Sequence, residues 1–434
     1  MAINATTVWR VRPSGSNTNG GGYDAAISGA GTDYSQQNSA QASGTHGSCT
    51  TSTFTDSTAA AFTTAMVGNA MYITGGGATT GFYFVISRTN ANTVVLDRSP
   101  GGSVSGATWH LGGGWADFWT NTTANIVGGN RVLVLGSGTP NPASYTYDYT
   151  HTSYFTPVNG DATNGRVSFE VDPATPGYKA PPDTTGGMPV IKVDGLTFYN
   201  ADNCNYKGLW FVASAANNAG YGVLGNPVNA LVFGCVLDQF GNDIGLSGSS
   251  GLSGSGMHVF GCEIFSSVSP GSAGSSFALY TGSYGMTIVG CNIHDTVGNG
   301  VSLGAMARLL MTTVAKCRGV GVQIWETTNG YLVLVQNNTI DGNLGHGIEI
   351  VTQTGLADLS AINNIISNHT QAGKYGMTVD AGTTAANDRI KALIDYNTFY
   401  NNTTDVNAIS YGAHDTHGGS NPFVGQSTEN YALA

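Results

Sequence analysis

The chain has 434 residues, 63 of them glycine, and only 9% of its residues are charged. Its formal net charge of −11, without a basic run, argues against nucleic-acid binding, whose electrostatic footprint is positive. No stretch approaches the roughly 20 apolar residues of a membrane span, so we expect no membrane insertion. The N-terminus lacks the basic and apolar regions of a secretory signal, which predicts synthesis in a cytosol.

Residues 1–30 begin with an extended segment, Val8-Trp-Arg-Val-Arg12, and continue into a polar, glycine-rich loop. We expect this strand to cap one end of the structure that follows, because an uncovered sheet end invites aggregation. Residues 31–112 have a different pattern, in which short apolar runs such as Phe82-Tyr-Phe-Val-Ile86 flank tight turns. Four or five short strands of this kind predict a small inserted antiparallel β-barrel or sandwich.

Residues 113–434 carry a repeated template. A short apolar strand runs into Gly-Cys or Asn-Asn, and an apolar residue follows two positions later. The predicted anchor positions of seven repeats are Cys235, Cys262, Cys291, Thr313, Asn338, Asn364 and Asn397. Successive differences between these numbers are 27, 29, 22, 25, 26 and 33 residues. Repeats of this length indicate a solenoid, and because they contain strands but no helix-length apolar pattern, they predict a parallel β-helix.

Period-2 alternation within the strands predicts which side chains point inward. We expect the following to lie inside the coils: Ile293, Val301, Leu303, Ile340, Ile348, Ile350, Ile366 and Phe399. The anchors should stack at the strand spacing of ~4.8 Å, where asparagines can hydrogen-bond along the column. Cysteines in that column are expected to be small buried residues in the reduced state. No CxxC pair is present, so we expect no metal site.

Several segments resemble the right-handed parallel β-helix proteins of the pectate-lyase-like superfamily. The matching segments are Val11-Arg-Pro-Ser-Gly-Ser-Asn-Thr-Asn-Gly20 (opening turn), Val127-Gly-Gly-Asn-Arg-Val-Leu-Val134 (first coil), Asn338-Thr-Ile340 and Asn397-Thr-Phe399 (asparagine ladder), and Asn421-Pro-Phe-Val424 with Tyr431-Ala-Leu433 (closing segment). The resemblance covers most of residues 1–30 and 113–434. The repeat and the right-handedness of parallel β crossovers predict a right-handed β-helix from about 113 to 420. The polar, proline-containing residues 136–188 are expected to be loops on one side of the first coils.

The insert has a resemblance of its own. Four segments resemble a module of β-helix proteins from tailed bacteriophages and related environmental sequences: Thr32-Asp-Tyr-Ser-Gln-Gln37, Met66-Val-Gly-Asn69, Gly81-Phe-Tyr83 and Val94-Val-Leu-Asp-Arg-Ser-Pro100. This implies a virion protein (a spike, a fibre or a decoration protein) with capsid or tail proteins as partners and a host-surface polysaccharide as a candidate ligand. Long solenoid faces can pack around a threefold axis, which favours a homotrimer. The insert would attach the chain to the particle, and its deletion should leave the β-helix folded.

Stacking the coils by their anchors predicts two outward columns. One contains Asp238, Phe265, His294, Lys316, Asp341, Ser367 and Tyr400, and the other contains Ser302, Gln323, Glu349 and Thr378. Together they suggest a groove lined by Asp295, Lys316, Arg318, Asp341 and Glu349. Lyases of the superfamily need clustered acids for calcium and a basic residue, and hydrolases need two acids close in space.

The residues of this groove match no catalytic set of the superfamily, and His346 in Gly345-His-Gly347 lacks the expected catalytic neighbours. Lys316 and Asp341 equally suit a solvated ion pair worth ~0–1 kcal/mol. We therefore favour a non-enzymatic virion component without a cofactor. The alternative is a polysaccharide lyase or hydrolase, such as a phage depolymerase, with Asp341, Glu349, Asp295 and Lys316 as catalytic candidates. Trp325 is a candidate platform for a sugar ring, although a lone tryptophan also suits packing against a loop or subunit.

Overall fold

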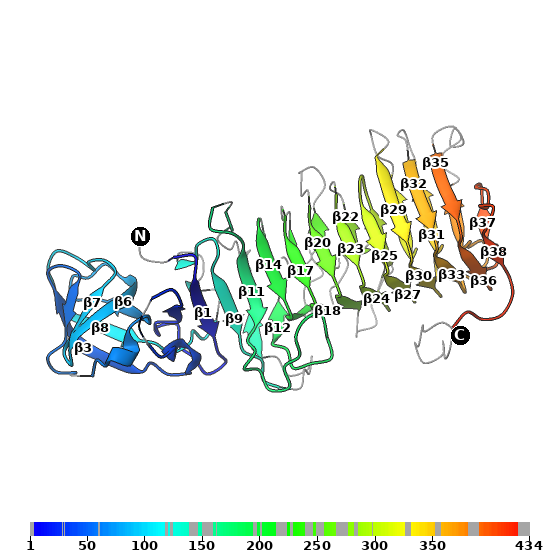
Figure 1. Cartoon of the computed structure of the whole chain (residues 1–434). Coiled ribbons are helices and arrows are strands. Elements are labelled where there is room, and N and C mark those ends of the chain that lie inside the picture. The colour runs from blue at the N-terminus through cyan, green and yellow to red at the C-terminus, as the bar shows by residue number, and fades with distance from the viewer. Residues whose placement is uncertain are drawn as a thin grey trace.

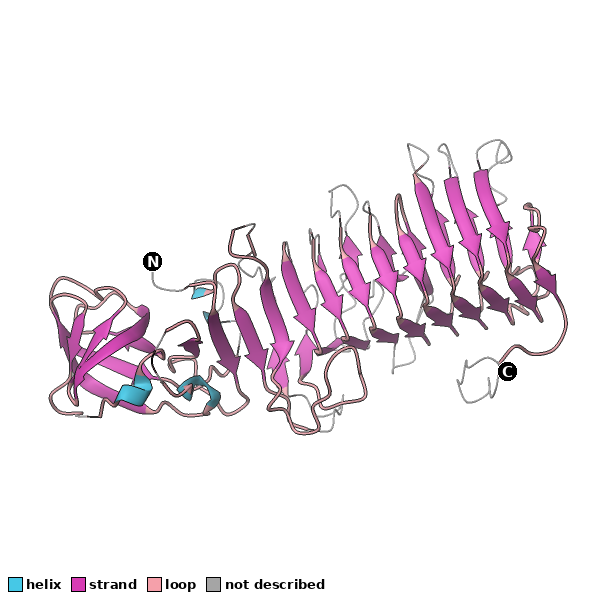
Figure 2. Ribbon diagram, viewed as in Figure 1, coloured by secondary structure: helices cyan, strands magenta, loops and turns pink. Residues whose placement is uncertain are grey.

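The computed structural model is an elongated, almost entirely β molecule, with a barrel at the N-terminal end of a long stack of strands (Figures 1 and 2). Three sheets run along the stack, and a closed antiparallel barrel precedes them. The predicted fold class, a parallel β-helix with an inserted β-barrel, is therefore confirmed. The structure describes all residues except 1–3, 28, 30, 60, 118–119, 122–124, 139–145, 150–158, 162, 194–197, 200–201, 214–223, 226–228, 239–245, 249–255, 266–276, 282–284, 297, 326–330, 352–356, 381–389 and 424–434.

Sheet I has twelve strands, which are parallel apart from the outermost one. In spatial order they are β2 (Gly22–Asp24), β1 (Thr7–Val11), β9 (Arg131–Val134), β11 (Val167–Val171), β14 (Cys204–Lys207), β17 (Leu231–Phe233), β20 (His258–Phe260), β23 (Thr287–Val289), β26 (Arg308–Leu310), β29 (Leu332–Gln336), β32 (Ala357–Ile362) and β35 (Ile390–Asp395). β1 pairs in parallel with β9, and β2 pairs antiparallel with β1. The predicted capping strand is thus the first rung of the helix, and β2 covers its edge.

Sheets II and III form the other two faces, and all their strands are parallel. Sheet II contains β10 (Tyr147–Tyr149), β12 (Val190–Val193), β15 (Trp210–Ala213), β18 (Val236–Asp238), β21 (Glu263–Phe265), β24 (Asn292–His294), β27 (Thr313–Ala315), β30 (Thr339–Asp341), β33 (Ile365–Ser367), β36 (Thr398–Tyr400) and β38 (Thr416–His417). Sheet III contains β13 (Phe198–Tyr199), β16 (Leu224–Gly225), β19 (Leu246–Gly248), β22 (Phe277–Thr281), β25 (Asn299–Leu303), β28 (Val322–Trp325), β31 (Ile348–Val351), β34 (Met377–Val379) and β37 (Val406–Asn407).

The barrel occupies most of the predicted insert and closes in the order β3-β4-β7-β6-β5-β8. Its strands are β3 (Ala42–Cys49), β4 (Thr53–Thr55), β5 (Ala70–Thr74), β6 (Gly81–Asn90), β7 (Thr93–Leu96) and β8 (Val104–Leu111), accompanied by the short 3₁₀ helices η1 (Tyr34–Gln36) and η2 (Thr64–Met66). The apolar runs in β6 and β7 predicted these two strands. β3 is mostly polar and glycine-rich, so its sequence gave no strand signal.

All eight side chains predicted to point inward are buried at 0% exposure, which confirms the period-2 assignment. Strand pairing stacks them into columns: on sheet II, Ile264, Ile293, Val314, Ile340, Ile366 and Phe399 follow one another in register. Because each rung adds one apolar side chain to such a column, the core grows with the number of coils.

The corner between sheets I and II explains the template. In each of the seven repeats the chain turns there through one residue with positive φ, and the anchor follows it. The corner residues are Gly234, Gly261, Gly290, Met311, Asn337, Asn363 and Tyr396, with φ between 49° and 62°. Glycine and asparagine tolerate this left-handed conformation best, so most repeats carry one of them. The template Gly-Cys or Asn-Asn is thus a corner residue followed by a buried anchor.

One predicted anchor is wrong by one residue. The backbone N–H of Cys291 donates to Thr312 Oγ1 (3.3 Å), and the N–H of Thr312 donates to Asn338 Oδ1 (2.9 Å). Thr312, and not Thr313, therefore occupies the anchor column. Since Met311 takes the corner position in this coil, neither glycine nor asparagine marks it, and two consecutive threonines left the register ambiguous.

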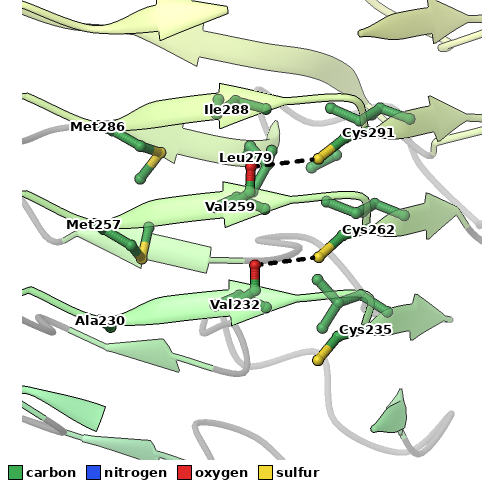
Figure 3. Packing of buried hydrophobic residues seen from close by; sticks show 14 of the residues in the cluster. Ala230, Val232, Cys235, Met257, Val259, Cys262, Leu279, Met286, Ile288 and Cys291 are labelled. Carbon is green, nitrogen blue, oxygen red and sulfur yellow. Dashed lines mark hydrogen bonds between the residues drawn. The ribbon is translucent and has the colours of Figure 1, made fainter. Parts of the chain in front are cut away.

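Cys235, Cys262 and Cys291 stack in the anchor column, as predicted (Figure 3). All three thiols are buried and free of disulfides. The Cys262 thiol donates to the carbonyl of Val232 and the Cys291 thiol to that of Val259, each at 3.7 Å. These bonds hold each anchor to the strand of the preceding coil.

Asparagines replace the thiols farther along the same column. Asn338 Nδ2 donates to the Leu309 carbonyl (2.9 Å) and to Asn364 Oδ1 (3.0 Å). Asn364 Nδ2 donates in turn to Asn397 Oδ1 (2.9 Å). The predicted asparagine ladder is therefore present, and its donors reach strand carbonyls equivalent to those that the cysteines reach in earlier coils.

The loop that follows β11 lies across the corners of the early coils. A Cβ atom at Gly234 would come within 2.6 Å of Pro182, and one at Gly261 within 2.4 Å of it. At Gly290, one coil beyond the loop, a Cβ would meet nothing within 4 Å. Glycine is therefore needed at the early corners for close approach as well as for positive φ.

Candidate functional site

The outer face of sheet III carries the predicted column of polar side chains. Strand pairing aligns Ser302 with Gln323, Gln323 with Glu349, and Glu349 with Thr378, and extends the column to Asn407. Neighbouring members are one strand spacing, ~4.8 Å, apart. We call these five residues the sheet III row.

Hydrogen bonds join members of the row in pairs. Gln323 Nε2 donates to Glu349 Oε2 at 2.6 Å, and Asn407 Nδ2 donates to Thr378 Oγ1 at 3.1 Å. Ser302 Oγ and Gln323 Oε1 are buried and have no hydrogen-bond partner among the residues that the structure describes. Burial raises the pKa of Glu349, and the bond from Gln323 only partly offsets this.

His346 lies beside Glu349. Its Nδ1 accepts the backbone N–H of Tyr375 (3.1 Å), and its ring stacks on the Tyr375 ring with centroids 5.4 Å apart. Since Nδ1 accepts, the proton of the neutral ring is on Nε2, which is 3.9 Å from Glu349 Oε1. Burial and the nearby charge of Lys374 lower the pKa of His346 to about 4. A neutral imidazole therefore faces the only carboxylate of the row.

Trp325 is on the same strand as Gln323 and two residues after it, so the two side chains lie on the same face of sheet III. The indole is half-buried, and its Nε1 is buried without a hydrogen-bond partner among the described residues. The candidate sugar platform thus lies at the edge of the sheet III row.

Asp341 belongs to another face. It ends β30 in sheet II, is 3% exposed, and accepts hydrogen bonds from Ser367 Oγ (2.7 Å) and Asn368 Nδ2 (2.6 Å). These contacts join successive coils, which is a structural role.

Lys316 does not occupy its predicted column. Ala315 pairs with His294 on one side and with Asp341 on the other, so Ala315 takes that place. The shift follows from the anchor at Thr312. Lys316 instead occupies the corner after sheet II, with φ 53°, where its backbone N–H donates to the Asp341 carbonyl at 3.0 Å.

Asp295 occupies the same corner one coil earlier, with φ 47°. Its carboxylate is 2.8 Å from His294 Nδ1, while His294 Nε2 is 3.4 Å from Glu263 Oε1. Burial disfavours protonation of His294, but the hydrogen bonds to both carboxylates outweigh it and raise its pKa. Arg318, in the next coil, donates its backbone N–H to Thr296. The groove residues are therefore divided: Asp341 lies on sheet II, Asp295, Lys316 and Arg318 follow it at the corner, and Glu349 lies on sheet III.

The sequence identified four members of the sheet III row and Trp325, but missed the pairing of His346 with Glu349 and Tyr375. The sequence feature that could have revealed this pairing is the position of His346 just before β31, three residues ahead of Glu349. Within the described part of the chain, no group of three or more histidine, cysteine or acidic side chains could hold a metal ion. In the same part, no helix has the length and hydropathy needed to cross a membrane.

Comparisons with known proteins find similar structures but no matching sequences. No protein-family model matches the chain, and no curated protein matches it. Pectate lyase Pel9A superposes with a TM-score of 0.41 at 10% identity, covering 74% of this chain and 79% of its own. The catalytic domain of GH87 α-1,3-glucanase in complex with nigerose gives 0.33 at 10% identity, covering 88% and 89%.

A phage protein is also among the similar structures. The gp54 tailspike of Acinetobacter baumannii bacteriophage AP22, in complex with A. baumannii capsular saccharide, gives a TM-score of 0.25 at 11% identity. The match covers 87% of this chain and 64% of the tailspike. At these identities the similarity concerns the fold alone.

Proposed function

We propose that the chain is a structural component of a bacteriophage virion, a spike or fibre, which binds a surface polysaccharide along the sheet III row without cleaving it. The observation that carries the binding proposal is the row itself, with Trp325 at its edge. The virion assignment is supported by the resemblance of residues 31–112 to phage modules. A homotrimer with capsid or tail proteins as partners is part of the same proposal.

The row suits a linear chain of hydroxyl-rich units. Its polar side chains recur every ~4.8 Å along the helix axis, so an extended glycan parallel to that axis could contact the partly exposed members Gln323, Glu349 and Asn407. Ser302 and Thr378 are only 1% and 3% exposed, so the groups that sugar hydroxyls could bond are the amides of Gln323 and Asn407 and the carboxylate of Glu349. The indole of Trp325 offers a flat apolar surface for a sugar ring.

A second candidate function rests on Glu349 and His346. Because burial raises the pKa of Glu349, its carboxyl group is better suited to hold a proton than an exposed one. In a polysaccharide lyase or hydrolase it would serve as a general acid, with the neutral His346 positioning it. This candidate uses the same face, so binding experiments alone do not separate the two functions.

Substitution of Trp325 tests the binding site. We expect Trp325→Ala to lower affinity for purified surface polysaccharide of the host by roughly tenfold, equivalent to about 1.4 kcal/mol, because the stacking surface is lost. Calorimetric titration measures this. Leu393→Ala, an exposed residue of sheet I, is the matched control and should leave affinity unchanged. If the wild type and both variants have equal affinities, the glycan binds elsewhere on the chain or does not bind at all.

Product analysis separates binding from cleavage. We expect prolonged incubation with the polysaccharide to release no oligosaccharides. If the wild type releases oligosaccharides, and Glu349→Gln abolishes this release while its affinity stays within about twofold of the wild type, the chain is an enzyme instead. For the virion assignment, the chain should cofractionate with purified particles.

A further inference from the structure

A second column of buried polar side chains lies at the corner between sheets II and III. Asn343, His369 and Asn402 occupy equivalent positions on three successive coils. Asn343 Nδ2 is 3.3 Å from His369 Nε2, and His369 Nδ1 is 2.9 Å from Asn402 Oδ1. The imidazole is 0% exposed. An ionisable ring is thus inserted between two amides deep in the stack.

The amide on one side of the ring has a fixed orientation. Asn343 Oδ1 accepts the backbone N–H of Cys317 (2.9 Å), and Asn343 Nδ2 donates to the Val314 carbonyl (3.2 Å). Asn343 therefore presents an N–H donor to His369 Nε2. Turning the amide over would lose both backbone bonds.

The amide on the other side is fixed in the opposite sense. Asn402 Oδ1 accepts the backbone N–H of His369 (3.1 Å), and Asn402 Nδ2 donates to the Ile366 carbonyl (2.9 Å). Asn402 therefore presents an acceptor to His369 Nδ1. The two amides together specify the neutral ring with its proton on Nδ1 and a lone pair on Nε2.

Protonation is incompatible with this arrangement. A proton on Nε2 would point at the N–H donor of Asn343, and the positive charge would lie in the dry interior. The ring also has little room to move, because a Cβ at Gly347 would already come within 2.9 Å of His369 Cε1. We propose that His369 is an acid-sensitive clasp, whose protonation breaks the hydrogen-bonded link between the last coils and loosens the C-terminal end of the β-helix.

The charged groups around His369 do not compensate for its burial. Asp341 on β30 favours the charged ring, Asp405 lies behind Asn402 (Asn402 Nδ2 to Asp405 Oδ1, 2.9 Å), and His346 is on the preceding corner. Burial dominates, and it lowers the pKa of His369 to about 4 despite the bond to Asn402 and the charge of Asp341.

The direction of the pH effect follows from this. A histidine whose pKa is lower in the folded state binds its proton more readily when unfolded, so acid favours unfolding. The stabilising contribution is complete above the unfolded pKa of about 6.5 and declines as the pH falls toward 4. Over this window, the ratio of folded to unfolded protein should drop by about two orders of magnitude through His369 alone.

His369→Asn tests the clasp, because asparagine at this position could continue a ladder between Asn343 and Asn402. Denaturant unfolding is measured at pH 7, 6, 5 and 4. We expect the wild type to lose stability steeply below pH 6.5 and the variant to lose about 100-fold less. His346→Asn is a control for the other low-pKa histidine, and His294→Asn for one with a raised pKa, whose effect has the opposite sign.

Hydrogen exchange of the wild type, corrected for the intrinsic rate, locates the opening without any variant. Between pH 7 and pH 5 we expect protection to fall in residues 340–405 while the coils before residue 290 keep theirs. The proposal would be overturned if the pH dependence of the unfolding stability persisted in His369→Asn but disappeared in His346→Asn. Uniform loss of protection along the β-helix would overturn it as well.

Discussion

At the scale of single residues, the buried anchors show how polar groups stabilise a solenoid. Asn364 Oδ1 accepts both the backbone N–H and the side-chain amide of Asn338, each at 3.0 Å. Its own amide donates to the Val335 carbonyl at 2.8 Å. Every polar atom of the side chain is satisfied inside the stack, so its removal would leave several buried groups without partners.

Asn364→Ala should therefore be strongly destabilising. We expect a loss of about 2–4 kcal/mol in the free energy of unfolding, because the donors of Asn338 lose their acceptor. Cys262→Ala, at the equivalent position of an earlier coil, removes only weak thiol bonds and should cost about 1 kcal/mol. Denaturant titration measures both. Similar losses for the two variants would mean that the ladder contributes through packing rather than hydrogen bonding.

At the scale of elements, strands were easier to predict from sequence than corners. Ile340, Ile348 and Ile350 follow period 2, so the sequence assigned them to the interior correctly. The corner before Thr312 has methionine where most other coils have glycine or asparagine, and the predicted register is wrong by one residue there. That single slip placed Lys316 beside Asp341 in the predicted site. The contact of His346 with Tyr375 joins two corners that are 29 residues apart in the sequence, and no local sequence pattern predicts it.

Met311, like Tyr396, is a corner residue that departs from the template. It is 61% exposed and has a φ of 49°, a conformation that costs most side chains ~1–2 kcal/mol. Met311→Asn should raise stability by about 1 kcal/mol, since asparagine tolerates this conformation and could bond to Asn337, as Asn363 does at 2.6 Å. Thermal unfolding measures the gain. Leu332→Asn, at a similarly exposed strand position, should give none, and an equal gain there would indicate a general effect of replacing exposed apolar groups.

At the scale of the whole molecule, the barrel is joined to the first coil by an aromatic cluster. Trp9 of β1 stacks on Trp115 with centroids 4.6 Å apart, and Phe82 and Phe84 from β6 pack edge-to-face with Trp9 at centroid distances of 5.9 and 6.0 Å. All four side chains are at most 2% exposed. The barrel thus covers the apolar end of the β-helix, a function that the sequence had assigned to the strand at residues 8–12 alone.

Polar contacts reinforce the same junction. Arg10 Nη1 is 2.8 Å from Asp172, and Arg10 Nε is 3.1 Å from Asp33, which precedes the barrel. Asp172 also contacts Arg12 at 3.3 Å and is 1% exposed. Removing one partner of such a network leaves a buried charge unpaired, which costs more than the network contributes when intact. The junction therefore couples the insert to the β-helix.

Replacing residues 31–112 with a short glycine-serine linker tests this coupling together with the predicted independence of the insert. We expect the β-helix to remain folded by circular dichroism but to self-associate beyond the state of the full chain, because Trp9 and Trp115 become exposed. Light scattering after size-exclusion chromatography measures this. The same deletion with Trp115→Ser should associate less, since the exposed apolar surface is smaller. If the deletion variant has the same oligomeric state and melting temperature as the full chain, the barrel does not stabilise the β-helix. Under the proposed virion function, its loss should then affect only incorporation into particles.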